Sequence, residues 1–135
     1  MNFRLFILIF IFYLVSFKGD QKYKDGHYSG ISRAGYTDEP YYGRVKIDID
    51  SGKIVRIVFT IRDSSKHVYF DGNYEKFFTG NDLYIQQCRT DWKGVKSYPD
   101  TLLKYQDLDR IDVISGATWS YNIFRAAVRQ ALKGN

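Results

Sequence analysis

The sequence predicts a small α+β domain, in which an antiparallel β-sheet with a hairpin packs against a C-terminal helix. Two patterns support this fold class. Residues 44–50 alternate between polar and apolar, and residues 53–62 resume the alternation after a Ser-Gly turn, as paired strands do. Residues 119–132 instead repeat apolar side chains every three or four positions, which is typical of an amphipathic helix.

The first 21 residues are expected to form a signal peptide or membrane anchor, and residues 22–135 the domain. Residues 5–15 are uninterrupted apolar sequence between Arg4 and Lys18, as in an export signal. A run of roughly a dozen apolar residues is short for a membrane span, which takes about 20. Because no small-x-small cleavage site stands out, both the cleaved and the anchored form stay open. Either form predicts an extracytoplasmic location, periplasmic or membrane-anchored and facing outside.

The remaining elements follow from local patterns. Residues 28–32 predict a short strand before the hairpin. After the hairpin, residues 74–78 predict a helical turn and residues 82–87 a strand. The Tyr-Pro-Asp sequence at residue 98 is expected to open a helix that ends at residue 105. Residues 111–114 are expected to be a short strand or an extended entry to the last helix.

The two hairpin strands each have one apolar face. The first strand offers three β-branched side chains and the second offers four apolar ones, which suits a pleated, half-buried surface. These residues are Val45, Ile47 and Ile49 in the first strand, and Val55, Ile57, Phe59 and Ile61 in the second.

Composition excludes several kinds of site. The chain has one cysteine, Cys88, and two histidines, so neither an internal disulfide nor a zinc-type ligand set is expected. The net charge is +5, but Lys and Arg do not alternate with aromatic residues, so no nucleic-acid partner is expected. The mild basic excess suits an anionic ligand or association with a membrane. No acid–base pair or nucleophile–histidine arrangement can be assigned, so no catalytic residue is predicted.

Residues 112–120 are the most informative stretch, because small residues and hydroxyls stand directly before the last helix. The first turn of a helix offers unpaired N–H groups and the positive end of its dipole to a phosphate. Gly116 and Ala117 keep side-chain bulk low there. Ser115 adds a hydroxyl donor, and Thr118 supplies an oxygen that can form a phosphoester. The competing interpretation is that Thr118 is only an N-cap of its own helix.

This stretch resembles the flavinylation motif of the FMN-binding domain family, in which the final Thr receives FMN. Each motif position is matched: Asp112, Ser115, Gly116, Ala117 and Thr118. Similar domains occur in the C subunit of the sodium-pumping NADH:quinone oxidoreductase and in the G subunit of the Rnf complex. Those subunits often carry Thr-Ser after the motif and one variable residue, whereas this chain has Ser120-Tyr121.

Looser matches extend the resemblance over nearly all of residues 22–135. They are Tyr28-Ser29-Gly30, the Gly35-Tyr36 pair, residues 43–49, and Gly52-Lys53-Ile54. The resemblance implies FMN as the cofactor, with the redox chemistry supplied by FMN and its binding, exposure and potential set by the protein. For the flavin ring, Trp119 and Tyr36 are the preferred contacts, and Tyr41 and Tyr42 are further candidates by residue type.

The resemblance also implies a function and partners. We expect an exported flavoprotein that relays electrons from a membrane donor or another redox partner protein to an extracytoplasmic acceptor. An FAD:protein FMN transferase would attach FMN to Thr118, using FAD and Mg²⁺. Asp112 would either orient the Thr118 hydroxyl or help the transferase hold its metal and diphosphate substrate. The alternatives are a module that binds FMN noncovalently, the flavin subunit of a separate reductase, and an interaction protein with a vestigial motif.

Overall fold

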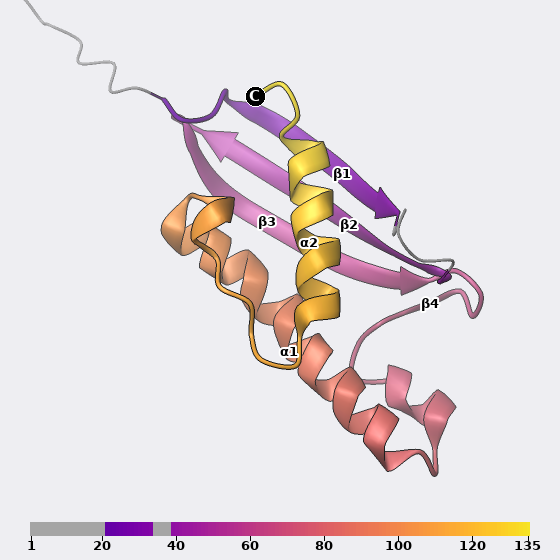
Figure 1. The fold of residues 1–135 in the computed structure, drawn as a ribbon. Coiled ribbons are helices and arrows are strands. Elements are labelled where there is room, and N and C mark those ends of the chain that lie inside the picture. Colours follow the sequence, from indigo (N-terminus) through magenta and orange to yellow (C-terminus); the bar gives the residue numbers. More distant parts are fainter. Residues whose placement is uncertain (1–20, 34–38) are drawn as a thin grey trace, which may run out of the picture.

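The computed structural model describes residues 21–33 and 39–135, which form an antiparallel four-stranded sheet with both long helices on one face (Figure 1). This arrangement confirms the predicted α+β class. The strands follow one another across the sheet in chain order: β1 (Gly26–Arg33), β2 (Tyr41–Asp50), β3 (Lys53–Asp63) and β4 (Val68–Tyr69). The helices are α1 (Asp82–Tyr105) and α2 (Thr118–Ala131), with short 3₁₀ helices η1 (Tyr74–Phe78) and η2 (Leu108–Arg110).

The predicted hairpin is confirmed as β2 and β3. Ser51 and Gly52 form its two-residue turn, with φ of 52° and 74°. Two positive φ values in succession match the right-handed twist of the paired strands. On β2, Val45, Ile47 and Ile49 all face the helices and are at most 5% exposed.

On β3 the predicted apolar face is wrong at one position. The pairing register shifts, so that Asp48 faces Arg56 whereas Ile49 faces Ile54. Val55 is the extra residue of this bulge and is 55% exposed, while Ile54 is buried. A bulge reverses the alternation of side chains on its strand, which a strict two-residue period does not anticipate.

The C-terminal helix agrees with the sequence to within one residue. Its apolar side packs across β1 and β2, and Ile123, Phe124 and Ala127 are fully buried there. At Gly30 of β1, an added Cβ would lie only 2.0 Å from the Ala127 carbonyl oxygen. The strand and the helix can therefore approach this closely only because Gly30 has no side chain.

The middle of the chain differs most from expectation. Residues 82–87, predicted as a strand, are the first turns of α1, and the helix expected to open at Pro99 instead runs through it. Asn81 caps α1, because its side chain accepts a hydrogen bond from the Tyr84 amide at 3.2 Å. An interior proline costs about 3 kcal/mol. Burial of one side of α1 offsets this cost, because Cys88, Val95 and Leu102 are all at most 8% exposed.

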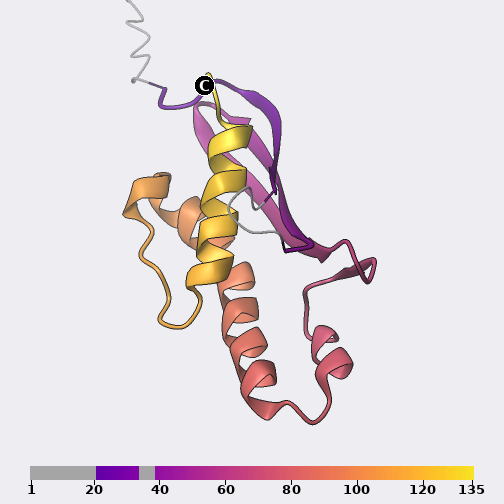
Figure 2. The ribbon, with the colours of Figure 1, turned by 45° about the vertical axis from the view of Figure 1, so that its right-hand side comes forward.

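The two short segments around the helices agree with the sequence. The turn expected at residues 74–78 is η1, which lies beside the first half of α1 (Figure 2). Residues 111–114 have no regular structure, and Ile111 is extended with φ −91° and ψ 115°. This segment is therefore the extended entry to α2 rather than a strand.

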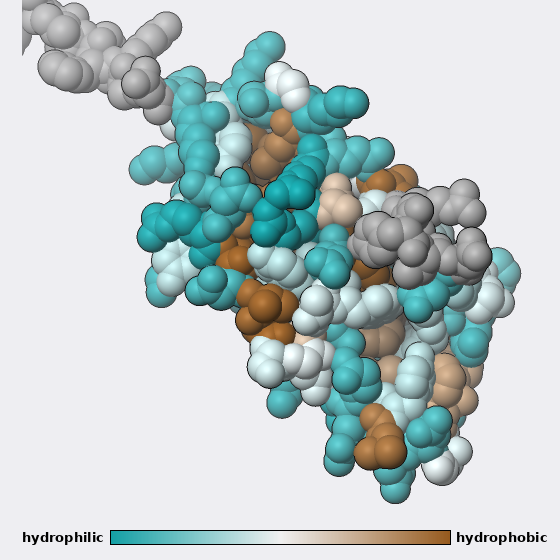
Figure 3. Space-filling model, in the orientation of Figure 1, coloured by the Kyte–Doolittle hydropathy of each residue, from teal (hydrophilic) through white to brown (hydrophobic). Residues whose placement is uncertain are grey.

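The predicted leader lies outside the described residues except for Gln21, so its boundary with the domain stays a prediction. Between residues 21 and 135, no helix that the structure describes has the length and apolar character to cross a membrane. Seen from the helix side, the surface is largely hydrophilic, and hydrophobic residues gather in separate patches (Figure 3).

Candidate functional site

The predicted attachment motif forms the loop that leads from η2 into α2. The Ala117 amide donates to the Ile114 carbonyl at 2.9 Å, which closes a four-residue turn. Gly116 is the third residue of this turn and has φ +81°, the value that a type II turn requires there. A Cβ on Gly116 would also lie 3.0 Å from the Thr90 side chain of α1. Both the backbone conformation and the contact with α1 therefore favour glycine.

Side chains of α1 hold this loop from the inside of the molecule. The Tyr98 hydroxyl donates to the Ala117 carbonyl and accepts from the Ile114 amide, both at 3.0 Å. One hydroxyl thus ties together the two ends of the turn. The Gln87 side-chain amide donates to the Gly116 carbonyl at 2.7 Å. The loop is fixed by long-range contacts, and its backbone polar groups are used in holding it.

Asp91 of α1 caps the start of α2 from a different helix. Its Oδ1 accepts from the Ser120 hydroxyl at 3.0 Å and from the Ser120 amide at 3.2 Å, while Oδ2 accepts from Gln87 at 2.8 Å. A carboxylate at this place satisfies an otherwise unpaired amide and interacts favourably with the helix dipole. Gly94 makes the close packing possible, because a Cβ there would lie 2.6 Å from Ser120 Oγ.

Thr118 is the first residue of α2 and is exposed, whereas Ala117 is the cap residue. No side chain caps α2 in the way that the competing interpretation requires of Thr118. Within residues 21–33 and 39–135, no hydrogen bond engages the Thr118 hydroxyl or the amides of Thr118 and Trp119. The structure therefore disagrees with a plain N-cap and leaves a hydroxyl and two amide donors available at the start of this helix.

The other motif residues divide into an exposed group and a buried one. Asp112 and Ser115 are exposed beside Gly116, whereas Ala117 is fully buried. The Ala117 side chain packs on α1, where a Cβ on Gly94 would come within 3.1 Å of it. Among the described residues, no hydrogen bond links Asp112 to Thr118, so Asp112 does not orient the Thr118 hydroxyl here. Contacts of these residues with FMN stay predictions.

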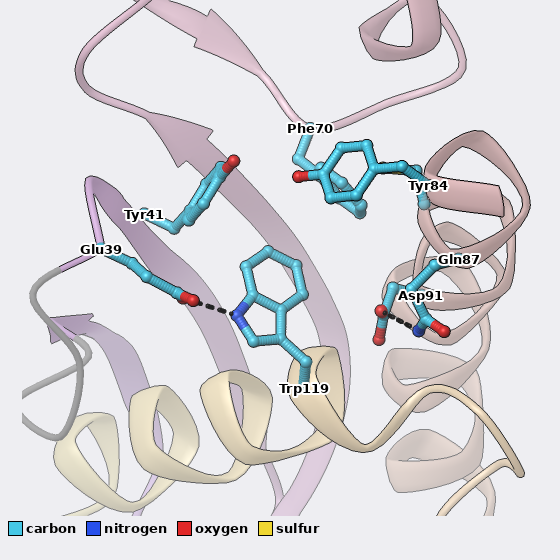
Figure 4. A pocket seen from close by; sticks show the side chains of 8 residues that line it. Glu39, Tyr41, Phe70, Tyr84, Gln87, Asp91 and Trp119 are labelled. Atoms are coloured by element: carbon cyan, nitrogen blue, oxygen red, sulfur yellow. Dashed lines mark hydrogen bonds between the residues drawn. The ribbon is translucent and has the colours of Figure 1, made fainter. Parts of the chain in front are cut away.

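A cavity of about 250 Å³ begins at Trp119, the residue after Thr118 (Figure 4). Trp119 donates its indole N–H to Glu39 at 3.0 Å and meets the rings of Tyr41 and Phe70 edge-on, with centroids 5.1 Å away in each case. The opposite wall comes from α1. The lining residues are Glu39, Tyr41, Phe70, Tyr84, Gln87, Cys88, Asp91 and Trp119.

The aromatic residues suggested by the sequence have different places. Trp119 and Tyr41 line this cavity. Tyr42 follows Tyr41 in β2, and consecutive strand residues point to opposite faces of the sheet, so Tyr42 faces away from it. Tyr36 lies outside the described residues, and its contact with the ring stays a prediction. Burial raises the pKa of the Cys88 thiol in the cavity wall, which keeps it protonated and favours a packing role.

Comparison with known proteins identifies the family. The family model described as the FMN-binding domain matches residues 35–133. The chain belongs to the FMN-binding domain family. FMN is therefore its cofactor. The crystal structure of the CPE2226 protein from Clostridium perfringens is similar, with a TM-score of 0.62 and 26% identity over 82% of this chain and 87% of that chain. Among curated proteins, none matches the chain.

The donors and the cavity at this site are compatible with FMN. Among the described residues, the start of α2 offers an unengaged hydroxyl and two amides for a phosphate, and aromatic side chains form part of the wall of the neighbouring cavity. Pockets that enclose a whole drug-sized ligand measure roughly 300–1,000 Å³. The present cavity of about 250 Å³ is therefore too small to enclose the whole of FMN.

Sequence reasoning missed most of the cavity wall. Four of the lining residues belong to the first half of α1, which was not predicted as a helix. The missed lining residues are Glu39, Phe70, Tyr84, Gln87 and Asp91. One signal was present: Asn81-Asp82 is a typical helix start, and Cys88, Val95 and Leu102 recur seven residues apart behind it.

Proposed function

We propose that this FMN-binding domain carries FMN covalently, through a phosphoester on Thr118, and relays electrons outside the cytoplasm. The state of Thr118 carries the proposal. Its hydroxyl is exposed and unengaged among the described residues, and the next residue, Trp119, lines an aromatic cavity. A phosphate on Thr118 would lie at the positive end of the α2 dipole, where an anion is stabilised.

Attachment requires a partner enzyme, for which we propose an FAD:protein FMN transferase acting with Mg²⁺. A bond forms between Thr118 Oγ and the phosphorus of the FMN half of FAD. The diphosphate bond of FAD breaks, AMP leaves, and the hydroxyl proton passes to a base. The exposed carboxylate of Asp112 is suited to contact the metal and diphosphate held by the transferase.

In the relay itself, FMN supplies reversible one- and two-electron chemistry. The residues of the chain bind and orient it. Trp119, Tyr41 and Phe70 provide an apolar enclosure for the ring, and the hydrogen bonds from α1 hold the attachment loop in one conformation. An exposed attachment point leaves FMN accessible to a membrane electron donor and to an acceptor, which a relay requires. We propose that the leader places the domain outside the cytoplasm.

Intact mass tests the attachment. The full chain is co-expressed with an FAD:protein FMN transferase that is active on an established substrate, beside the variants Thr118→Ala and Thr79→Ala. Thr79 is also an exposed threonine, which makes it a matched control. We expect wild type and Thr79→Ala to gain the mass of one FMN less one water, and Thr118→Ala to gain nothing.

Two outcomes would overturn the attachment. In one, wild type gains no mass but binds free FMN, which would favour the noncovalent module. In the other, Thr118→Ala gains the same mass as wild type, which would place the phosphoester elsewhere. Steady turnover of a soluble acceptor that requires a separate dehydrogenase would instead favour the flavin subunit of a reductase.

A further inference from the structure

The far end of the cavity holds a chain of buried hydrogen bonds that the attachment motif does not involve. The Tyr41 hydroxyl, which lines the cavity, is 2.6 Å from the Tyr74 hydroxyl. Tyr74 in turn donates to Asp63 Oδ2 at 2.7 Å. Tyr74 is 1% exposed and Asp63 is 0% exposed, so this series of hydrogen bonds runs from the cavity into the core.

Asp63 is held in its ionised form. Burial by itself raises the pKa of its carboxyl, but hydrogen bonds outweigh burial and lower the pKa to about 2. The donors are the Ser65 hydroxyl at 2.6 Å, the Tyr74 hydroxyl, and the amides of Ser65 and Lys66 at 2.9 and 3.2 Å. The Lys66 ammonium lies 3.6 Å from Oδ2. An ionised carboxylate only accepts hydrogen bonds.

The ionised state of Asp63 fixes the donor and the acceptor in each of these hydrogen bonds. A tyrosine hydroxyl has one proton, and Tyr74 gives its proton to Asp63. Tyr41 must therefore donate its own proton in the hydrogen bond between Tyr41 and Tyr74. With its own proton committed, Tyr41 can offer only oxygen lone pairs to the cavity. In Figure 4 its hydroxyl lies at the end of the cavity opposite the α2 backbone and points toward that of Tyr84.

We propose that Tyr41 is a hydrogen-bond acceptor for an N–H group that the flavin ring gains on reduction, and that Tyr74 and Asp63 are positioning residues that keep it an acceptor. The proposal rests on the ring occupying the cavity beside Trp119. The oxidised ring has one N–H group, whereas the neutral reduced ring has additional ones at the nitrogens that take up protons. An acceptor therefore binds the reduced ring more strongly and raises the midpoint potential of FMN.

The test measures the midpoint potential of bound FMN by spectroelectrochemical titration. The samples are wild type, Tyr41→Phe, Tyr74→Phe and Tyr69→Phe. Tyr69 is 55% exposed and lies outside the cavity, so Tyr69→Phe is the matched control. At a fixed applied potential, we expect Tyr41→Phe to lower the ratio of reduced to oxidised FMN by about tenfold. For a two-electron couple this corresponds to a fall in the midpoint potential of about 30 mV.

Tyr74→Phe separates positioning from packing. It keeps the Tyr41 hydroxyl but removes the oxygen to which that hydroxyl donates, so the Tyr41 proton is free to point into the cavity. We therefore expect the midpoint potential to fall as well, by less than in Tyr41→Phe. Urea unfolding of each variant confirms that it is folded. An unchanged potential in either Tyr41→Phe or Tyr74→Phe, relative to Tyr69→Phe, would overturn the proposal.

Sample preparation keeps this test independent of the phosphoester. If mass measurement shows covalent FMN, the potentials are measured on that protein. If it does not, the covalent proposal fails, and the same four proteins are reconstituted with free FMN. A fall in potential on mutation of Tyr41 or Tyr74 then still supports the acceptor role, and its absence still refutes that role.

Discussion

At the scale of single residues, buried carboxylates organise both ends of the site. Asp91 caps the start of α2, and Asp63 accepts the last of the hydrogen bonds that link Tyr41, Tyr74 and Asp63. Each carboxylate accepts hydrogen bonds at both of its oxygens. Neither residue was recognised in the sequence, where aspartates most often indicate exposed positions. A buried acid becomes informative only when its donors are known, because the donors come from other elements of the fold.

The lowered pKa of Asp63 predicts a pH-dependent contribution to stability. A pKa of about 2, against an ordinary value of 3.8, corresponds to about 2 kcal/mol. Since the folded pKa is the lower one, this stabilisation is present above about pH 4 and is lost as the pH falls toward about 2. We expect the difference in free energy of unfolding between wild type and Asp63→Asn to shrink over that range.

Urea unfolding at about pH 7, 4 and 2.5 measures this difference. The control is Asp50→Asn, which removes an exposed carboxylate that accepts, among the described residues, only from the adjacent Ser51 hydroxyl. Its difference from wild type should stay small at each pH. If the difference in free energy of unfolding between wild type and Asp63→Asn stays constant from neutral to acid pH, the lowered pKa of Asp63 is contradicted.

At the scale of elements, local patterns predicted those elements whose periodicity is uninterrupted. The hairpin and α2 agree with the sequence because each has a clean apolar face. In α1, Asp91 and Gly94 stand on the buried side and Pro99 lies in the interior. Each of these residues argues against a helix locally, and burial against β3 and α2 outweighs all three.

Gly94 provides an element-scale prediction. In an exposed helix, Gly→Ala is stabilising by about 1 kcal/mol. Here the new methyl would lie 2.6 Å from Ser120 Oγ of α2 and 2.7 Å from the Tyr98 ring of α1 itself, so the packing around this position must shift. We expect Gly94→Ala to destabilise the fold by roughly 1–3 kcal/mol.

Thermal and urea unfolding measure this effect, and Lys93→Ala is the control because Lys93 is the exposed neighbour on the same helix. Its effect should remain within about 0.5 kcal/mol. Stability of Gly94→Ala equal to or above that of wild type would show that the interface between α1 and α2 is looser than the contacts indicate.

At the scale of the whole molecule, the proposed location depends on residues 1–21. The apolar run with basic residues on either side predicts export. We expect the full chain to be recovered in the extracytoplasmic or membrane fraction of a bacterial host. A variant lacking residues 1–21 should instead remain in the cytoplasm.

Fractionation followed by intact mass distinguishes the two forms of the leader. A shortened chain released from the membrane indicates a cleaved signal peptide, and an intact chain in the membrane fraction indicates an anchor. The FMN content of each fraction shows where attachment takes place. Recovery of the full chain in the cytoplasm would contradict the proposed location.

The sequence by itself determined the family motif from Asp112 to Thr118, the hairpin and α2, because each depends on residues close together in the chain. Tertiary structure decided the rest. It showed that Thr118 is not the helix cap, that Tyr41 rather than Tyr42 lines the cavity, and that α1 supplies its opposite wall. These features depend on contacts between residues such as Asp91 and Ser120, or Tyr41 and Tyr74. Such contacts form only when packing brings distant segments together, and no local periodicity encodes them.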